Sequence, residues 1–404
     1  MNTVETLQSP LRLAVLTLAI SHFEAPLFRL CAQSAGLQFK VFYVHPVKAA
    51  QRFDSDYAQQ IDWGYDLLSG YDSSQVDDTS KLPRAAEEWQ ADVVLVYGYG
   101  WPGAPRIILR NWWRGQAQVH RGTLNYYLDP RRPVKGRLMR PLGRLLLKLF
   151  DAHHYGGDYS RKVLLDAGAK EPSLFFVPYS VDTPHFLAAA TNPDQRKAAA
   201  DIRTTLGWAE DDHVILFIAQ HNWFKGPDIA MEVFQELAKA DPKARFLVVG
   251  SGSMTEAMKA NARQHLDPRT IHFAGFVPSA NTVAYYLASD LVLCTSRYET
   301  WARMVNEAML CRRPCLVSRI VPSAGGLIVH NENGYVVEKP TASQFVPVIQ
   351  RHFALSLEER RRMGDAACQK AQTFAYEPYV GNVVAAARYA LAHSRRRKAA
   401  TNSK

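Results

Sequence analysis

Two glutamates eight positions apart, Glu299 and Glu307, lie in "TSRYETWARMVNEAML" (295 to 310), where an apolar strand pattern runs into a helical pattern. On one helix, eight residues rising about 1.5 Å each span about 12 Å, which places both carboxylates on one side, two turns apart. This spacing suits a ligand with hydroxyl groups at both ends, and the free N–H groups near Ala302 to Met304 suit an anion between them. A nucleotide sugar has this layout. Singly, each glutamate also fits an ordinary helix position.

Two further segments place ligand-binding residue types after apolar strands. In "HNWFKGPDIA" (221 to 230), Lys225 and Gly226 begin a helix, where a lysine can reach a phosphate. The plainer interpretation is a surface lysine in a turn. In "VVGSGSM" (248 to 254), Gly250 and Gly252 allow a ligand to approach the backbone closely, or mark a plain turn.

The composition is that of a globular protein, with 404 residues, 47% hydrophobic and 21% charged. That length favours two domains. The five cysteines have no metal-ligand spacing and lie mostly in apolar runs, which predicts buried thiols in a reducing cytosol. No apolar run approaches the roughly 20 residues of a membrane span, and the first ten residues lack Lys and Arg. We therefore expect a cytoplasmic protein.

The net charge of +10 is unevenly distributed. The last ten residues are basic and are expected to form a solvated, disordered end. The segment 131 to 150, "RRPVKGRLMRPLGRLLLKLF", interleaves basic residues with leucines. It fits a helix lying on an anionic membrane surface and equally a core-facing helix with a basic rim. No nucleic-acid motif accompanies the charge, so nucleic acid is not an expected partner.

Short apolar runs alternate with helical patterns along the chain, which predicts parallel sheets covered by helices on both faces. Strands are expected at 11–20, 39–45, 92–98 and 173–179, and the alternation restarts at 213–219 after a polar, alanine-rich stretch. We predict an α/β protein with two facing, Rossmann-like, doubly wound domains and a cleft between them. The expected boundaries are 1–190 and 191–375, with a helix over 376–393 packing back on the first domain and a disordered tail at 394–404.

Taken in order, the motifs resemble those of a known family. "VVGSGSM", "IHFAGFVPSANTVAYYLASDLVLCTSRYETWARMVNEAMLCRRPCLVS" and "NENGYVV" (331 to 337) resemble the carboxyl-terminal domain of the retaining, GT-B fold glycosyltransferases of family 4. The Glu299-x7-Glu307 pair matches that family's paired glutamates. Residues 155 to 186 resemble its interdomain segment, so the resemblance covers about 150 to 375.

The resemblance implies roles for individual residues. Glu299 would bind donor-sugar hydroxyls near the reacting carbon, Glu307 the ribose hydroxyls and Lys225 the diphosphate, while backbone from Gly275 to Val277 would meet the base. The other donor-site residues implied are Gly250, Trp301, Ala302, Arg303 and Gln220. In the first domain, His120 is a candidate for approaching the donor sugar, and His22 and Arg121 are candidates on the acceptor side. A lone histidine is more often structural.

The chain departs from the family pattern at three places. Where the family commonly has Gly-Arg before the lysine, this chain has Ala219-Gln220, so one phosphate cation is missing, and Arg303 or Arg297 is a candidate substitute. The family's Phe-Gly is Trp301-Ala302 here. The glycine-rich turn after the first strand is replaced by "SHFEAPLFR" (21 to 29), which affects acceptor recognition.

The expected function is therefore retaining transfer of a hexose-type sugar from a nucleotide diphospho-sugar to a glycan, lipid-linked or lipopolysaccharide-like acceptor. No Asp-x-Asp is placed to hold a metal beside the diphosphate, so we expect neither a cofactor nor a required divalent metal. Two alternatives remain: an acceptor-independent GT-B enzyme, such as an epimerase or a phosphorylase, and an inactive, membrane-associated binding protein.

Overall fold

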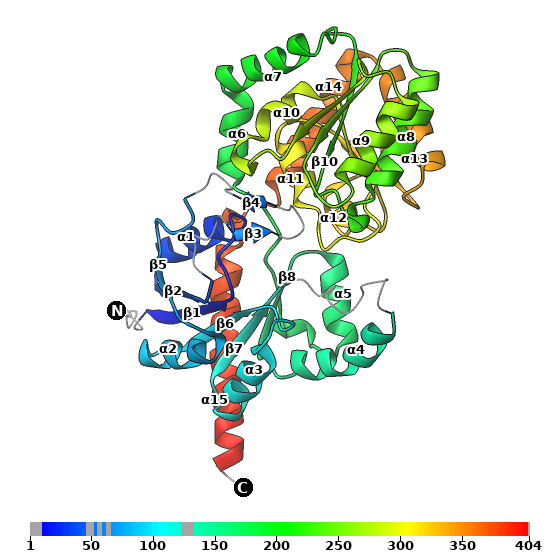
Figure 1. The fold of residues 1–404 in the computed structure, drawn as a ribbon. Coiled ribbons are helices and arrows are strands. Elements are labelled where there is room, and N and C mark those ends of the chain that lie inside the picture. The colour runs from blue at the N-terminus through cyan, green and yellow to red at the C-terminus, as the bar shows by residue number, and fades with distance from the viewer. Residues whose placement is uncertain (1–9, 46–51, 55–58, 62–65, 123–132, 403–404) are drawn as a thin grey trace. The chain divides into compact units, whose positions relative to one another are not determined.

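The computed structural model describes residues 10–45, 52–54, 59–61, 66–122 and 133–402. The chain forms two compact units. Unit 1 consists of Met1–Ala49, Asp66–Pro178 and Tyr376–Lys404, and unit 2 consists of Ala50–Tyr65 and Tyr179–Ala375. Each unit is built on its own parallel sheet with helices on both faces (Figure 1).

Unit 1 holds a seven-stranded sheet in the order β5-β2-β1-β6-β7-β8-β9. Its strands are β1 Leu11–Thr17, β2 Leu37–Tyr43, β5 Asp72–Gln75, β6 Val93–Tyr97, β7 Ala117–Arg121, β8 Ala152–Tyr155 and β9 Leu174–Phe176. Its helices are α1 Ala25–Gln33, α2 Leu82–Glu88, α3 Ala104–Trp113, α4 Pro133–Leu147, α5 Asp158–Asp166 and α15 Val380–Asn402. The central strands β1 and β6 are buried on both faces, as helices covering a parallel sheet require.

Unit 2 holds a six-stranded sheet in the order β12-β11-β10-β13-β14-β15, and a short antiparallel pair, β3 Arg52–Asp54 and β4 Gln59–Ile61. The parallel strands are β10 His213–Ile218, β11 Ala244–Val249, β12 Ile271–Gly275, β13 Leu291–Cys294, β14 Cys315–Ser318 and β15 Gly334–Val337. The helices are α6 Thr183–Thr191, α7 Pro193–Thr205, α8 Pro227–Ala240, α9 Thr255–His265, α10 Val283–Ala288, α11 Arg303–Leu310, α12 Ala324–Leu327, α13 Ala342–Ala354 and α14 Leu357–Gln372.

The strand order of unit 2 reverses direction between β10 and β13. From β10 the chain moves outward through β11 to β12, then returns to the other side of β10 and continues through β13, β14 and β15. At such a switch point the connections leave the two adjacent strands on opposite faces of the sheet, and a crevice opens at their carboxyl ends. The residues that follow β10 and β13 are therefore the first place to look for a ligand site.

The units divide ahead of the boundary expected from the sequence. The division falls between Pro178 and Tyr179, whereas the sequence pattern placed it at residue 190. The reason is that α6, which follows Val181 and Asp182, packs against α10 and α11 and so belongs to the second sheet. The predicted alternation located the restart of the strands but could not show where the preceding helix docks.

The carboxyl-terminal helix α15 runs from Val380 to Asn402 and packs against β7, β8 and β9 of unit 1. It covers the helix expected over 376–393 and continues through most of the tail that we expected to be disordered from residue 394, so that expectation was wrong. Alanine, arginine and lysine dominate this stretch and are all good helix formers, which explains the continuation.

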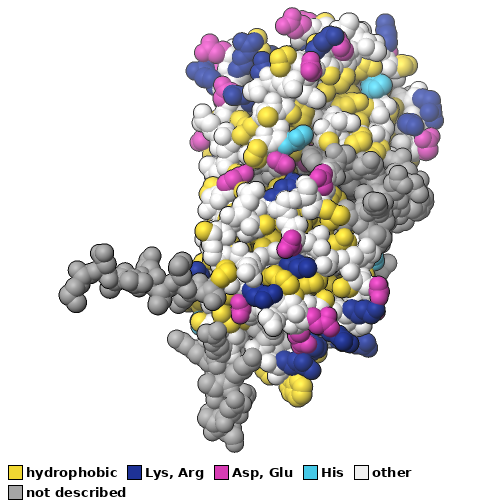
Figure 2. All heavy atoms as spheres, turned by 90° about the vertical axis from the view of Figure 1, so that its left-hand side faces the viewer, with side chains coloured by type: hydrophobic (Ala, Val, Ile, Leu, Met, Phe, Trp, Pro, Cys, Tyr) yellow, Lys and Arg dark blue, Asp and Glu magenta, His cyan; other side chains and the backbone are white. Residues whose placement is uncertain are grey.

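The surface carries both signs of charge. On the face drawn in Figure 2, basic and acidic side chains are interspersed.

The five cysteines, Cys31, Cys294, Cys311, Cys315 and Cys368, are buried free thiols, as predicted. Among the described helices, none combines the length and the apolar character that a membrane span requires.

Candidate functional site

The site candidates of unit 2 lie on the two connections that leave the switch point. Lys225 ends the short 3-10 helix Trp223–Lys225, which follows β10, and Glu299 lies in the turn that follows β13. These connections are hydrogen-bonded to each other, because the hydroxyl of Thr295 donates to the backbone oxygens of Lys225 (3.0 Å) and Gly226 (2.8 Å). The fold thus brings together two segments that are about 70 residues apart in the sequence.

Gly226 is required at this crossing for two reasons. Its φ of 65° lies in the left-handed region, and a Cβ atom there would stand 2.3 Å from the carbonyl oxygen of Thr295. No other residue type avoids both penalties. The close packing of these backbones fixes where Lys225 leaves the loop.

Lys225 and Glu299 form an ion pair between the ammonium Nζ and the carboxylate Oε1. Glu299 also accepts a hydrogen bond from the hydroxyl of Ser296 (3.1 Å) and one from the backbone N–H of Thr300 (3.2 Å). Its side chain is only 6% exposed, and that of Lys225 is 28% exposed. The carboxylate is held in one orientation while the lysine keeps access to solvent.

Glu307 occupies a different environment inside α11. Its carboxylate accepts a hydrogen bond from the hydroxyl of Tyr286 on α10, at 2.7 Å. Burial raises the pKa of Glu307 from 4.5 to about 7, although the Tyr286 hydrogen bond and the charge of Arg303 both act to lower it. The sequence analysis missed Tyr286, because nothing in a sequence links a tyrosine to a glutamate 21 positions away.

The helix α11 begins later than the glutamate spacing suggested. Arg303 is its first residue, so Glu299 lies outside it and the two carboxylates are not separated by two turns of one helix. Ala302 caps the helix with a φ of 68°, a left-handed conformation that costs a non-glycine residue about 1 kcal/mol or more. The helix therefore starts only after a sharp turn of the backbone.

Trp301 does not face the site, although we expected it among the donor-binding residues. It is 2% exposed, and its indole N–H donates to the side-chain oxygen of Asn306 (2.9 Å). Its ring packs near those of Tyr179 and Phe374. Trp301 supports the turn from behind, because its large apolar ring fills the space beneath the left-handed Ala302.

At Gly250 the chain's own backbone already requires a glycine, and its role in donor binding stays a prediction. A Cβ atom there would lie 1.9 Å from the carbonyl oxygen of Ala219, so the close approach is between two connections of the sheet. Gly275, at the end of β12, has open space where a side chain would be, and Val277 is half-buried two residues later. These two positions border the same edge of the sheet.

The missing phosphate cation is not replaced by Arg297. That arginine forms a bidentate ion pair with Asp228, with N···O distances of 2.6 and 2.5 Å, which neutralises its charge. Gln220 accepts a hydrogen bond from the side-chain amide of Asn222 (2.8 Å). Arg303 stays close to the site, since its charge acts on Glu307 and its guanidinium lies 5.9 Å from the ring centre of Tyr179.

In unit 1 the predicted catalytic histidine lies in the core. His120 is 0% exposed on β7, with its ring among those of Tyr99, Phe150 and His153. Burial and the neighbouring His153 and Arg121 hold its pKa well below the ordinary value, so it is neutral. As expected, β7 ends near His120, one residue later at Arg121, but the rings packed around the imidazole place His120 in the core.

Arg121 does not serve as a free phosphate ligand either. It is 2% exposed, and its guanidinium donates to the carbonyl oxygens of Val177 (2.9 Å) and Pro178 (3.2 Å), which anchors the end of unit 1. His22 is nearly buried beside Phe23, at a ring-centre distance of 3.7 Å. The acceptor-side roles of His22 and Arg121 stay predictions.

Metal ligands are not grouped in the part of the chain that the structure describes: no three His, Cys, Asp or Glu side chains converge there. The chemistry open to the site in unit 2 is therefore that of one lysine, two buried carboxylates and the N–H groups of a helix start. Such a set can bind an anion flanked by hydroxyl groups.

Known proteins resemble this chain in both sequence and fold. Residues 199–370, nearly all of unit 2 after α6, match the family described as Glycosyl transferases group 1. A D-inositol 3-phosphate glycosyltransferase of Segniliparus rotundus is 29% identical over 202 residues, which are 48% of this chain and 43% of the relative. The match thus spans less than half of that relative's length.

Two solved structures share the fold of this chain over most of its length. Anabaena HepE, in complex with UDP and glucose, has a TM-score of 0.68 at 15% identity, covering 93% of this chain and 98% of that one. WaaG, a glycosyltransferase involved in lipopolysaccharide biosynthesis, has a TM-score of 0.64 at 16% identity, covering 92% and 98%. The chain has the α/β architecture with two Rossmann-like units that defines the GT-B fold.

Proposed function

We propose that this protein is a retaining glycosyltransferase that moves a hexose-type sugar from a nucleotide diphospho-sugar to an acceptor hydroxyl. The observation that carries the proposal is the pairing of Lys225 with the buried Glu299 at the switch point of unit 2, next to Glu307 on α11. The match of this unit to group 1 glycosyltransferases and the nucleotide bound to HepE support it.

The diphosphate is assigned to Lys225 and to the N–H groups at the start of α11. A helix N-terminus attracts anions through its unpaired N–H groups and its dipole. A diphosphate arriving there competes with Glu299 for the ammonium of Lys225. The cation then faces the bond that breaks, and it stabilises the charge that develops on the leaving phosphate.

The two carboxylates are assigned to the two sugars of the donor. Glu299, oriented by Ser296 and the N–H of Thr300, accepts hydrogen bonds from hydroxyls of the transferred sugar. Glu307, oriented by Tyr286, accepts them from the ribose. Gly275 and Val277 border the place of the base.

Retention of the anomeric configuration follows, in this proposal, from attack on the same face from which the diphosphate leaves. The leaving phosphate oxygen accepts the proton of the acceptor hydroxyl, so no protein nucleophile is needed. The site holds the oxocarbenium-like centre against the acceptor, which is where positioning lowers the barrier. We propose no divalent metal in this step.

Binding of nucleoside diphosphates and nucleotide sugars by the purified protein tests the donor site. We expect one of them to raise the melting temperature selectively, because a ligand that binds only the native state stabilises it. UDP and UDP-glucose are the first to try. Lys225→Gln and Glu307→Gln should each remove the shift, and Lys239→Gln, an exposed lysine at the end of α8, should keep it.

Each outcome separates the proposal from its rivals. A shift that persists in both site variants would refute the assignment of the donor to this site. Turnover of the nucleotide sugar without any acceptor would favour an epimerase or a phosphorylase. If no nucleotide raises the melting temperature, an inactive binding protein becomes the favoured function. Gln220 in place of the usual arginine would fit that outcome. Anomeric analysis of the product by NMR tests retention.

We propose that the acceptor is glycan or lipid-linked and that unit 1 meets it at an anionic membrane surface. The described part of α4 turns Leu146 and Leu147 into the core but exposes Leu142 and Leu145 beside Arg140 and Arg144. From Arg140 on, the segment thus has a core-facing side and exposed leucines beside arginines, and the exposed side supports the membrane-surface alternative as our proposal. Residues 131 and 132 lie outside the described residues.

The neighbouring helix α3 extends the exposed apolar surface. It contacts α4 and exposes Leu109, Trp112 and Trp113, the last of these to 81%. Exposed tryptophans next to arginines are typical of proteins that insert into the interfacial region of a bilayer. A cavity of about 270 Å³, lined by Arg140, Arg144 and Tyr159 among others, lies beside α4 and suits an anionic headgroup.

Sedimentation with vesicles tests this surface. The protein should bind vesicles containing anionic phosphatidylglycerol and not vesicles of phosphatidylcholine alone, and Trp113→Ala with Leu145→Ala should weaken the binding. Leu357→Ala, a similarly exposed apolar residue in unit 2, is the matched control. If Trp113→Ala/Leu145→Ala binds the anionic vesicles as well as Leu357→Ala does, α3 and α4 are excluded as the docking surface.

A further inference from the structure

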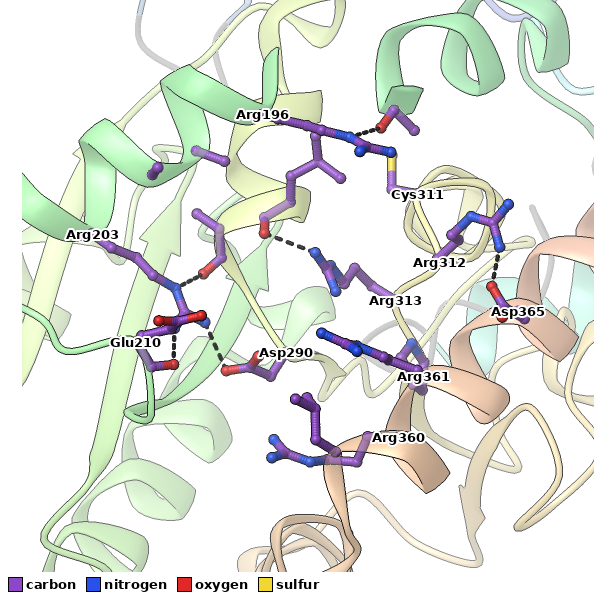
Figure 3. Close-up of a pocket in the computed structure, with 17 residues that line it drawn as sticks. Arg196, Arg203, Glu210, Asp290, Cys311, Arg312, Arg313, Arg360, Arg361 and Asp365 are labelled. Carbon is purple, nitrogen blue, oxygen red and sulfur yellow. Dashed lines mark hydrogen bonds and ion pairs between the residues drawn. The ribbon is translucent and has the colours of Figure 1, made fainter. Parts of the chain in front are cut away.

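A cavity of unit 2 lies at the amino ends of the strands. Lys225 and Glu299 lie at the opposite end, after the carboxyl ends of β10 and β13. The cavity has a volume of about 620 Å³ and is bounded by α7, α14, the end of α10 and the segments that enter β10, β13 and β14 (Figure 3). The four residues of β13, at about 3.3 Å each, separate the two ends by roughly 13 Å. No lining residue of this cavity belongs to the site described above.

The cavity is lined by an excess of positive charge. Three carboxylates, Glu210, Asp290 and Asp365, face six arginines, which come from α7, α14 and the turn after α11. The arginines are Arg196, Arg203, Arg312, Arg313, Arg360 and Arg361. Figure 3 shows them converging from several walls on one space, which distinguishes this group from a basic stripe along a single helix.

Three of these arginines have structural partners. Arg203 pairs with Asp290 (2.8 Å) and also donates to the backbone oxygen of Ala288 (2.8 Å). Arg313 donates to the backbone oxygens of Tyr286 and Leu287. These bonds satisfy carbonyl groups at the carboxyl end of α10, where cations are favoured.

Arg312 forms an ion pair with Asp365 on α14. The partners of Arg203, Arg312 and Arg313 explain why three arginines are present. They do not explain the other three.

Arg196, Arg360 and Arg361 lack a carboxylate partner among the residues that the structure describes. Arg196 makes only a long hydrogen bond to the backbone oxygen of Ala190 (3.4 Å). The guanidinium of Arg360 lies 5.6 Å from the ring centre of Phe353, and its buried Nε has no hydrogen-bond partner.

The charges of the cluster also repel one another. The pKa of Arg313 lies below its ordinary value, chiefly because of burial; Asp290 and Cys311 act to raise it, and the charges of Arg203 and Arg196 act to lower it. An anion in the cavity would reverse this repulsion, since each guanidinium would gain an opposite charge nearby. Guanidinium groups suit phosphate in particular, because their planar N–H pairs match its oxygens.

We infer that this arginine-lined cavity of unit 2 is a second anion site, which binds a soluble molecule carrying two or more phosphate groups. The excess of arginines over carboxylates calls for a ligand with more than one negative charge. The volume exceeds that of a single phosphate and falls in the range of small-molecule sites. The site does not depend on the proposed transferase activity, because it shares no residue with the donor site.

Calorimetric titration of the full chain with inorganic tripolyphosphate tests the inference. Arg360→Gln combined with Arg361→Gln should weaken binding at least about tenfold, because two charge-assisted contacts are lost. Arg196→Gln, on the opposite wall, should weaken it independently. Arg362→Gln is the matched control, since it removes the same charge from the same helix at an exposed position outside the cavity.

Lys225→Gln is the control variant for the donor site. It should leave tripolyphosphate binding at the arginine-lined cavity unchanged. Binding that survives both Arg360→Gln/Arg361→Gln and Arg196→Gln would overturn the inference, as would equal weakening by Arg362→Gln, which would mean diffuse surface charge. Loss of binding in Lys225→Gln alone would assign the anion to the donor site. Failure of the wild-type protein to bind tripolyphosphate would also overturn it.

Discussion

Replacement of Glu307 by glutamine should stabilise the protein at alkaline pH while it weakens donor binding. The carboxylate of Glu307 is 7% exposed, and burial raises its pKa from 4.5 to about 7. Between these two pH values the folded protein retains a proton that the unfolded chain releases. Stability therefore falls as the pH rises through this window, and the full cost is present above about pH 7.

The magnitude follows from the size of the shift. One pKa unit corresponds to about 1.4 kcal/mol, so an ionised Glu307 costs the folded state about 3 kcal/mol at about pH 8. Glutamine carries no charge, and its amide oxygen can still accept the hydrogen bond from Tyr286. Glu307→Gln should thus raise the free energy of unfolding by up to about 3 kcal/mol at pH 8 and by much less near pH 5.

Urea unfolding of wild type and variant at several pH values measures this difference. Glu332→Gln, which removes an exposed carboxylate from the same unit, is the control and should change stability little at any pH. The same Glu307→Gln protein should bind a nucleoside diphosphate about tenfold or more weakly, because a charged acceptor for the ribose is lost. A stability difference that is the same at every pH would refute the assignment of the shift to Glu307.

Further variants and conditions test other parts of the molecule. Lys225→Gln leaves the carboxylate of Glu299 without its cation and should lower the unfolding free energy by about 1 to 3 kcal/mol; unchanged urea midpoints would argue against the pair. Gly226→Ala should cost about 2 kcal/mol or more, from its left-handed φ and the contact with the carbonyl of Thr295, and a melting temperature equal to wild type would contradict this. Below about pH 6.5 the buried His153, with a pKa lowered to about 3, stays neutral in the folded state while the unfolded chain takes up a proton, so stability should fall by about 2 kcal/mol at pH 5. His153→Phe should reduce the acid dependence by about this amount and leave the share of the other buried histidines, and an unchanged dependence would exclude a contribution from His153.

Local patterns predicted most of the sheet of unit 2 correctly. The apolar runs at 213–219, 245–250 and 290–295 of the sequence match β10, β11 and β13 to within one residue at each end, because strands buried on both faces must be apolar throughout. The same reasoning placed Lys225 and Glu299 after adjacent strands. Their proximity follows from the pairing of β10 with β13, which the topology shows and the local patterns did not predict.

The histidines show where local patterns fail. "QVHRGTL" marks a strand, but the sequence does not reveal that pairing with β6 continues through Arg121. His120 lies in the core because the rings of Tyr99, Phe150 and His153 pack around it, and no local pattern shows these contacts. Trp301 was misassigned for a similar reason, since a motif position does not show whether a ring faces the ligand or the core behind it.

The sequence by itself determined the elements of this protein and the residue types at their ends, because strand burial, helix formation and the conformation of Gly226 depend on neighbours along the chain. Only the tertiary structure decided which polar groups meet. Lys225 and Glu299 are 74 positions apart, Tyr286 and Glu307 are 21 apart, and the six arginines of the arginine-lined cavity come from separate elements. These meetings depend on how sheets and helices pack, and burial then sets the charge of each group, as the raised pKa of Glu307 shows.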